Sequence, residues 1–164
     1  MVQSGAPWEM MTATGRRARP VFLGEYNHSL DEKGRLVMPR KFRPGLERGC
    51  VVTKGQDRCL FVFPLERWEE EAEKVLSLPR TDRRARNFAR SFFASASDQV
   101  PDRQGRVQIP ESLRAYAGLE KDVTIVGMAD HLELWSTETW AEVSADADAY
   151  YAEIGEVLSG DGGI

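Results

Sequence analysis

The sequence predicts an α+β fold in which short strands pair antiparallel and helices lie on their outside. Short segments rich in Val, Ile and Phe are bounded by Gly and Asp, which is typical of hairpin strands. Longer segments repeat their apolar residues at helical spacing, which indicates amphipathic helices. The sequence is also duplicated internally, so we expect both halves of the chain to contain the same elements.

The duplication is clearest at a five-residue pattern, Asp-x-x-Gly-Arg. It occupies 31–35 and recurs 71 residues later at 102–106. After one extra residue in the second copy the separation is 72 residues, and Trp68 then matches Trp140. Matches that keep their order across a single gap indicate one unit present twice. The period is too long for a solenoid, so we expect two half-domains that share one core.

Each copy predicts the same series of elements: an extended segment, a short strand, a short helix opened by a proline, a hairpin and a closing helix. In the first copy they are expected at 22–30, 35–38, from Pro39, 50–54 with 59–63, and 65–76. In the second copy they are expected at 95–100, 106–109, from Pro110, 123–128 with 132–135, and 137–158. Residues 81–93 predict one more helix, strongly basic on one side.

The expected domain organisation is a first repeat at 21–78, a linking helix at 79–94 and a second repeat at 95–158. Strands this short cannot build a wide sheet alone, so we expect the two copies to interleave their hairpins and close a small barrel that protects its edges. Large aromatic residues recur along both closing helices. Such stripes usually face a protein's own core, so self-association is the weaker interpretation of them.

The two ends of the chain lack the pattern of the repeats. Residues 1–20 hold Gly, Ser, Thr, Pro and three Arg without periodicity, which predicts a disordered extension. An alternative hypothesis is that this extension is not translated, because strong patterning begins at Phe22 and a GTG codon for Val21 could serve as the start. Residues 159–164 are rich in Gly, and we expect a flexible tail.

The overall charge hides a strong asymmetry along the chain. A net charge of −4 argues weakly against nucleic acid as a partner, because binding to phosphates needs clustered Lys and Arg. Residues 31–48 nevertheless carry six basic against three acidic side chains, and residues 80–114 carry eight against four. From residue 115 onward one Lys stands against eleven Asp and Glu, which most simply form a solvated helix face. The local distribution, not the total, sets the field that a partner meets.

Several classes of protein and of site are disfavoured. No apolar run reaches about 20 residues and the start is unlike a signal peptide, so we expect a cytoplasmic protein without membrane contact. Cys50 and Cys59 lack metal-site spacing and lie in strand-like surroundings, which predicts buried thiols. We therefore predict no metal, no other cofactor and no small-molecule substrate.

The Asp-x-x-Gly-Arg pattern has a structural meaning first. An Asp can accept hydrogen bonds from backbone N–H groups two or three residues on, which holds a tight turn, and Gly adopts a positive φ without steric cost. The Arg that follows begins a strand close enough to pair with the Asp. In the simplest interpretation each Asp–Arg pair stabilises its turn and does nothing more. The predicted turn-orienting residues are Asp31, Gly34, Asp102 and Gly105.

The basic side chains of these turns allow a second interpretation, contact with double-stranded DNA. A turn that projects from a barrel lies at the surface, and Arg matches phosphate oxygens or the O6 and N7 of guanine with two hydrogen bonds. An Asp behind the Arg can fix its orientation. Linked copies in an oligomer raise the effective concentration of such weak contacts. The candidate DNA-binding residues are Lys33, Arg35, Arg103 and Arg106.

Residues 22–43, which read FLGEYNHSLDEKGRLVMPRKFR, resemble the opening of MraZ proteins. The tandem Asp-x-x-x-Arg segments and the closing helices with Trp are also similar to that family, and the resemblance extends over 21–158. It implies an AbrB-like fold of swapped hairpins and ring-shaped homo-oligomers. The family's start lies at or near Val21, in keeping with an untranslated extension.

The resemblance also implies a function. MraZ proteins are transcriptional regulators, encoded at the head of the division and cell-wall gene cluster, that bind repeated sites in their own promoter, repress it and can associate with the nucleoid. Their DNA contacts lie in the Asp-x-x-x-Arg segments, here at Asp31, Lys33, Arg35, Asp102 and Arg106, with Arg103 as a local candidate. Gln104 departs from the basic or small residue often found there, so we expect the second loop to hold DNA less tightly. The acidic C-terminal region is expected to stay away from DNA.

Two other classes of function stay open. An enzyme is disfavoured, because His28 and His131 lack a neighbouring nucleophile motif and the sequence has no phosphate-binding Gly loop or metal-ligand cluster. Asp57 and Asp130 fall in hairpin turns, where Asp is common for conformational reasons. A non-enzymatic oligomeric scaffold for other proteins is the stronger alternative, and the acidic segment 137–158 suits it.

Overall fold

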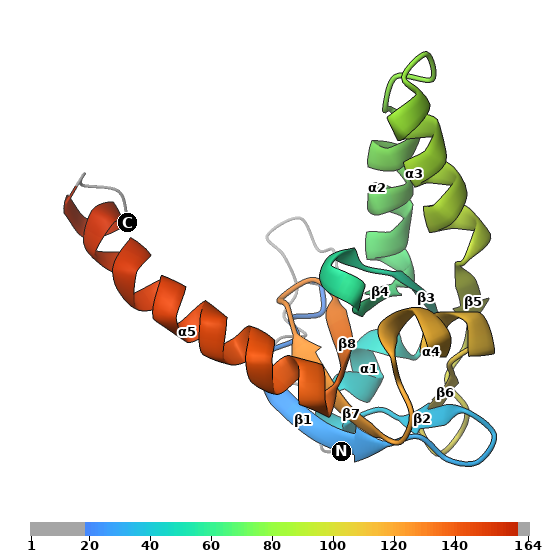
Figure 1. The fold of residues 1–164 in the computed structure, drawn as a ribbon. Helices are drawn as coiled ribbons and strands as arrows, with labels where there is room; N and C mark the ends of the chain where they lie inside the picture. Colours follow the sequence, from blue (N-terminus) through green and yellow to red (C-terminus); the bar gives the residue numbers. More distant parts are fainter. Residues whose placement is uncertain (1–18, 161–164) are drawn as a thin grey trace, which may run out of the picture.

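The computed structural model describes residues 19–160, with side chains described through residue 154. Most of the predicted extension and tail lies outside these residues. The first half contains β1 (Glu25–Ser29), β2 (Arg35–Val37), η1 (Arg40–Phe42), α1 (Arg43–Leu46), β3 (Cys50–Lys54), η2 (Gln56–Arg58), β4 (Leu60–Pro64) and α2 (Leu65–Leu76). The second half contains α3 (Arg83–Ala94), β5 (Ser97–Gln99), β6 (Arg106–Gln108), α4 (Glu111–Ala117), β7 (Asp122–Gly127), β8 (Leu132–Ser136) and α5 (Thr137–Gly160) (Figure 1). The mixed α+β class is confirmed, and the strands and helices fall within a few residues of their expected places.

Local sequence explains where the helices begin and end. Asp82 precedes α3, and its Oδ1 accepts the backbone N–H of Arg84 at 2.8 Å, which satisfies one of the free donors of the first turn. Gly118 ends α4 with a φ of 63°, a left-handed conformation that most side chains avoid. Pro39 and Pro110 each directly precede a short helix, where a missing N–H costs nothing.

The strands form one large sheet and one small ribbon. The six-stranded sheet has the order β1-β7-β8-β4-β3-β5, and its neighbouring strands are all antiparallel. Among the described strands no pairing joins β1 with β5, so the closed barrel that we expected is not found. β5 has only three residues and is soon followed by Pro101, which lacks a backbone donor, so this edge cannot extend its pairing. β2 and β6 pair separately as a two-stranded antiparallel ribbon.

The two halves are related by an approximate two-fold axis. Exchanging each strand for its equivalent in the other half, β1 for β5, β3 for β7 and β4 for β8, reproduces the sheet order read backwards. The register of β4 and β8 agrees with this exchange. Leu60 is equivalent to Leu132 and Val62 to Leu134, and Leu60 pairs with Leu134 as Val62 pairs with Leu132. The ribbon of β2 and β6 obeys the same exchange. The axis therefore runs through the centre of the ribbon and between β4 and β8.

A single core joins both halves. Fully buried apolar side chains from β2, β3, β4, β6, β7 and β8 pack together with those of the short helices. Phe42 meets the rings of Phe22 and Tyr26 edge to face, with centroids 5.4 and 5.2 Å away. Cys50 and Cys59 are buried free thiols, as predicted, and burial raises the pKa of Cys50 to about 12. Neither half could bury this surface alone.

Two helical arms extend from the sheet in different directions (Figure 1). α2 and α3 lie side by side and form the first arm, where Trp68 stacks on Phe92 with ring centroids 5.2 Å apart. α5 forms the second arm, and at its base Trp140 packs against Trp135. Farther out, Tyr150 and Tyr151 are 63% and 79% exposed. The aromatic stripe of this helix therefore faces the protein's own core only at its base.

Candidate nucleic-acid interface

The first Asp-x-x-Gly-Arg turn is held together by Asp31. Its Oδ1 accepts the backbone N–H groups of Lys33 and Arg35, both at 2.9 Å, and its Oδ2 accepts Nε–H of Arg35 at 2.7 Å. Gly34 closes the turn with a φ of 75° and donates its N–H to the carbonyl oxygen of Asp31 at 3.0 Å. Glycine adopts this φ without the strain that a side chain would introduce.

The second turn repeats this geometry atom for atom. Oδ1 of Asp102 accepts the backbone N–H groups of Gln104 and Arg106, both at 2.9 Å, and Oδ2 accepts Nε–H of Arg106 at 2.7 Å. Gly105 also has a φ of 75°. Each Asp thus fixes one edge of the guanidinium group at the start of the following strand.

These contacts lower the pKa of both carboxyl groups below its usual value. The largest cause is the backbone N–H of Arg35 for Asp31 and of Arg106 for Asp102, opposed by a smaller desolvation effect. The side chain of the same Arg and a second backbone N–H lower the pKa further. Both carboxylates are therefore charged at neutral pH, and each Arg keeps an anionic partner.

Arg35 and Arg106 share one face of the ribbon. Arg35 pairs with Gln108 and Val37 pairs with Arg106, so the two arginines are diagonal neighbours, about 7–8 Å apart in such a ladder. The central residue of each strand points to the opposite face and is fully buried. The side chains of Arg35 and Arg106 are 28% and 26% exposed. Two positive charges tolerate this proximity because each is paired with its own Asp.

The outer nitrogens of these arginines are not engaged within the described part of the chain. Each Asp binds Nε, and no hydrogen bond between described residues uses a terminal nitrogen of Arg35 or Arg106. Lys33 and Arg103 are exposed on the turns themselves. Because β2 and β6 are antiparallel, the two turns lie at opposite ends of the ribbon. Each end of the ribbon therefore carries one exposed cation beside one ion-paired Arg.

Each turn is completed by the other half of the chain. The carbonyl oxygen of Gly105 accepts the N–H of Met38 at 2.8 Å, and the carbonyl oxygen of Gly34 accepts the N–H of Ile109 at 2.9 Å. The side chain of Arg43 lies over Gly105, and its Nε–H donates to the carbonyl oxygen of Met38 at 3.0 Å. Arg114 lies over Gly34, and its Nε–H donates in the same way to the carbonyl oxygen of Ile109 at 3.0 Å. Both Arg side chains thus act across the axis.

A shallow hollow makes the two turns different. Its charged lining residues are Arg40, Arg43 and Glu47 of the first half and Asp102 and Arg103 of the second turn. In the other half Glu111 stands at the position equivalent to Arg40. The second turn consequently has more basic neighbours than the first. Sequence reasoning missed the position of Arg40, although the basic pair that follows Pro39 was a visible signal.

His131 contacts Asp130 and Phe61 and lies apart from the two Asp-x-x-Gly-Arg turns. Its Nδ1 lies 2.7 Å from Oδ1 of Asp130, and Oδ2 of Asp130 accepts Nε–H of Arg67 at 2.6 Å. Although burial acts against it, the hydrogen bonds from His131 and Arg67 lower the pKa of Asp130. The imidazole packs against the ring of Phe61, with centroids 5.0 Å apart. Asp130 therefore ties α2 to the second hairpin, a role that the sequence did not indicate.

Among residues 19–160, the features of two other kinds of site are absent. In that range no group of three or more His, Cys, Asp or Glu side chains could hold a metal ion. None of the helices described there is long and apolar enough to cross a membrane.

Comparison with known proteins identifies the family. A family model described as "MraZ protein, putative antitoxin-like" matches the chain twice, over residues 21–91 and 92–154. The chain belongs to the MraZ family. The double match also agrees with the internal duplication, and it leaves the first twenty residues outside the MraZ pattern.

Individual MraZ relatives align over nearly their whole length. The chain is 48% identical over 141 residues to a protein named Transcriptional regulator MraZ from Thermobifida fusca. The aligned region covers 85% of this chain and 99% of that protein. A protein of the same name from Parafrankia sp. is also 48% identical, with the same coverage. The relative from Acetivibrio thermocellus is 46% identical over 139 residues, or 85% of this chain and 97% of that protein.

Proposed function

We propose that this chain is a sequence-specific, double-stranded-DNA-binding transcriptional regulator that represses its own promoter in the division and cell-wall gene cluster. One observation carries the proposal: Arg35 and Arg106 lie on one face of a ribbon, each fixed by an Asp through Nε and each with its outer nitrogens unengaged among the described residues. The name Transcriptional regulator MraZ, printed for the relatives, supports it.

The chemistry of the two turns suits recognition of DNA. A guanidinium group held along one edge loses little freedom on binding, and its other edge can donate two parallel hydrogen bonds to a phosphate or to guanine. Lys33 and Arg103 are exposed on the turns, and on this proposal they would bind neighbouring phosphates. On this proposal Arg35 and Arg106 read bases, whereas Lys33 and Arg103 supply affinity that depends on salt.

Self-assembly forms part of the proposal. One chain offers two turns, and few arginines per turn give weak binding. A ring-like homo-oligomer would present many such turns to repeated sites and raise the affinity by linkage alone. On this proposal the protein acts in the cytoplasm, associated with the nucleoid.

Binding of the chain to a labelled fragment of its own promoter tests the proposal. We expect the wild-type protein to shift the fragment, with an affinity that falls steeply as salt rises. The double substitution Arg35→Ala, Arg106→Ala should abolish the shift without changing the mass of the oligomer. Arg48→Ala is the matched control, because this exposed Arg pairs with Glu66 and lies outside the turns.

The same experiment separates the proposal from its rival. An oligomeric scaffold for other proteins would leave the promoter fragment unbound at every salt concentration. An unrelated fragment of equal length bound as tightly as the promoter would remove the claim of sequence specificity. A reporter under the promoter that stays equally active with and without the protein would remove the claim of repression.

A further inference from the structure

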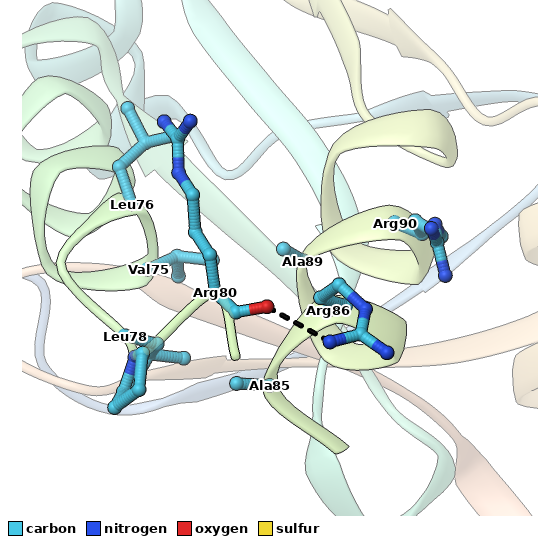
Figure 2. Close-up of a pocket in the computed structure, with 9 residues that line it drawn as sticks. Val75, Leu76, Leu78, Arg80, Ala85, Arg86, Ala89 and Arg90 are labelled. Atoms are coloured by element: carbon cyan, nitrogen blue, oxygen red, sulfur yellow. Dashed lines mark hydrogen bonds between the residues drawn. The ribbon is translucent and has the colours of Figure 1, made fainter. Parts of the chain in front are cut away.

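The arm formed by α2 and α3 carries a groove that the DNA-binding turns do not use. The groove lies where the end of α2 meets the first part of α3 (Figure 2). Its apolar side chains come from Val75, Leu76 and Leu78, and its floor on α3 is formed by the small residues Ala85 and Ala89. Leu76 and Leu78 are exposed. This surface is apolar, concave and uncovered by the described residues.

Arginine side chains border this groove. Arg80, Arg86 and Arg90 line it, and the last two lie one helical turn apart on α3. Arg86 donates from a terminal nitrogen to the carbonyl oxygen of Arg80 at 2.9 Å, so the loop is fixed against the helix (Figure 2). α3 contains four Arg and no acidic residue. The groove thus combines an apolar floor with a positive border.

The outer part of α5 has the complementary character. Beyond Val143 the helix runs on for roughly 25 Å at 1.5 Å per residue. Ala147, Tyr151 and Ile154 continue the apolar stripe at helical spacing, and Tyr151 is largely exposed. Asp146 and Asp148 lie in the same stretch, and the chain has no Lys or Arg after Lys121.

The groove and the outer part of α5 do not meet within one chain. α5 packs on β7 and β8 at its base and then leaves the sheet in a different direction from α2 and α3 (Figure 1). A helical segment without tertiary contacts is only marginally stable in water, so this overhang gains from a partner. The two surfaces are complementary in charge and both carry apolar side chains, which indicates another copy of this chain as the partner.

We propose that the acidic outer half of α5 docks into the arginine-bordered groove of α2 and α3 on a second copy. Tyr151 and Ile154 lie on the apolar floor, and Asp146 and Asp148 meet Arg86 and Arg90. The contact is heterologous, because donor and acceptor are different surfaces of one protomer. Such contacts repeat from copy to copy and close into a ring when the rotation permits. The inference rests on the proposed self-assembly and gives it a specific interface.

Charge reversal on each side tests the contact. The groove variant Arg86→Glu, Arg90→Glu and the helix variant Asp146→Arg, Asp148→Arg should each reduce the mass in solution from the oligomer to a single chain. A protein that carries all four substitutions should recover the oligomer, which a merely unstable variant cannot do. The control variant Arg83→Glu, Arg84→Glu makes the same charge change on α3 outside the groove and should keep the wild-type mass.

Mixing the two variants tests the direction of the contact. The groove variant keeps an intact α5 and the helix variant keeps an intact groove, while the reversed charges of the two variants also complement each other. An equimolar mixture should therefore reassemble into oligomers in which the two kinds of chain alternate. An unchanged oligomer in both variants, or failure of the four-substitution protein to reassemble, would overturn the inference. If the groove variant keeps its mass and loses promoter binding, α3 contacts DNA instead, which also overturns it.

The outcomes distinguish this inference from the proposed function. A wild-type protein that is a single chain at all concentrations refutes the proposed self-assembly and with it the contact. If the wild type is an oligomer and both charge-reversal variants keep its mass, only the contact is refuted. A protein that assembles through the contact but leaves the promoter unbound refutes only the proposed regulation of transcription.

Discussion

Arg43 lies directly over Gly105, so that a Cβ built on this glycine would overlap Nε of the arginine. The same Nε–H is hydrogen-bonded to the carbonyl oxygen of Met38, which means that Arg43 cannot move aside without losing that bond. The turn of the second half is therefore shaped by a side chain of the first half.

Substitution of Gly105 by Ala should destabilise the protein through two effects. The φ of 75° costs a non-glycine residue about 1–2 kcal/mol, and displacement of Arg43 adds to this. Gly118→Ala is the control, since Gly118 has a φ of 63° and its added Cβ meets nothing within 4 Å. Urea unfolding should show a larger loss for Gly105→Ala. Equal losses for the two variants would mean that the contact with Arg43 is unimportant.

Loss of a single turn arginine should weaken promoter binding without affecting the fold. We expect Arg35→Ala to reduce the affinity by about 1–3 kcal/mol, roughly 5- to 150-fold, if the guanidinium group reads a base. Fluorescence anisotropy on the promoter fragment measures the loss, and light scattering checks that the mass is unchanged. If Arg35→Ala unfolds the protein instead, the Asp31–Arg35 pair serves only to stabilise the turn.

The two arginines should contribute to binding almost equally. From Gln104 alone we expected a milder effect at Arg106, but the hollow places Arg40 beside the second turn and replaces the basic charge that Gln104 lacks. Arg106→Ala should therefore cost as much affinity as Arg35→Ala. In an Arg40→Ala background the contribution of the second turn should fall. A clearly smaller effect of Arg106→Ala in the wild-type background would restore the earlier expectation.

The turns should lose stability in acid. The pKa values of Asp31 and Asp102 are lowered in the folded protein, chiefly by the backbone N–H groups of Arg35 and Arg106. A lowered folded-state pKa stabilises the protein above the unfolded value of about 3.9, and this stabilisation disappears as the pH falls through the folded-state pKa. Thermal unfolding between pH 6 and pH 3 should show a smaller decline for Asp31→Asn, Asp102→Asn than for the wild type. Parallel curves would exclude these two groups as a source of the acid sensitivity.

Trp68→Ala should cost less than removal of a fully buried tryptophan. The sequence indicated a core position, but Trp68 is only half-buried, because it lies on the arm where it stacks on Phe92. The loss in unfolding free energy should therefore stay below the roughly 3–5 kcal/mol typical of a buried Trp. Chemical denaturation followed by circular dichroism measures it. A loss above that range would show that the arm is more tightly coupled to the sheet than its packing indicates.

The sequence predicted the elements and the turns well because both depend on local chemistry. Asp31 and Gly34 are three residues apart, and a turn of this kind needs only their own backbone and side chains. Apolar spacing likewise placed α2 and α5 close to their observed bounds.

Features that depend on contacts between the two halves could not be predicted from the sequence. The position of Arg40 beside Arg103 follows from the exchange of strands across the axis, and no spacing along the chain encodes it. The closed barrel was expected from strand length alone, yet the pairing of β5 ends before Pro101. The sequence indicates only a turn role for Asp130, because its partner Arg67 lies 63 positions away.

The presence of one such turn in each half has a consequence for orientation on a double helix. A dimer of identical subunits reads both strands alike and favours palindromes. Here the symmetry is broken, since Lys33 stands where the other half has Gln104, and Arg40 where it has Glu111. On the proposed function each protomer would therefore possess polarity, with a left and a right end, and a row of protomers would match direct repeats that all point the same way.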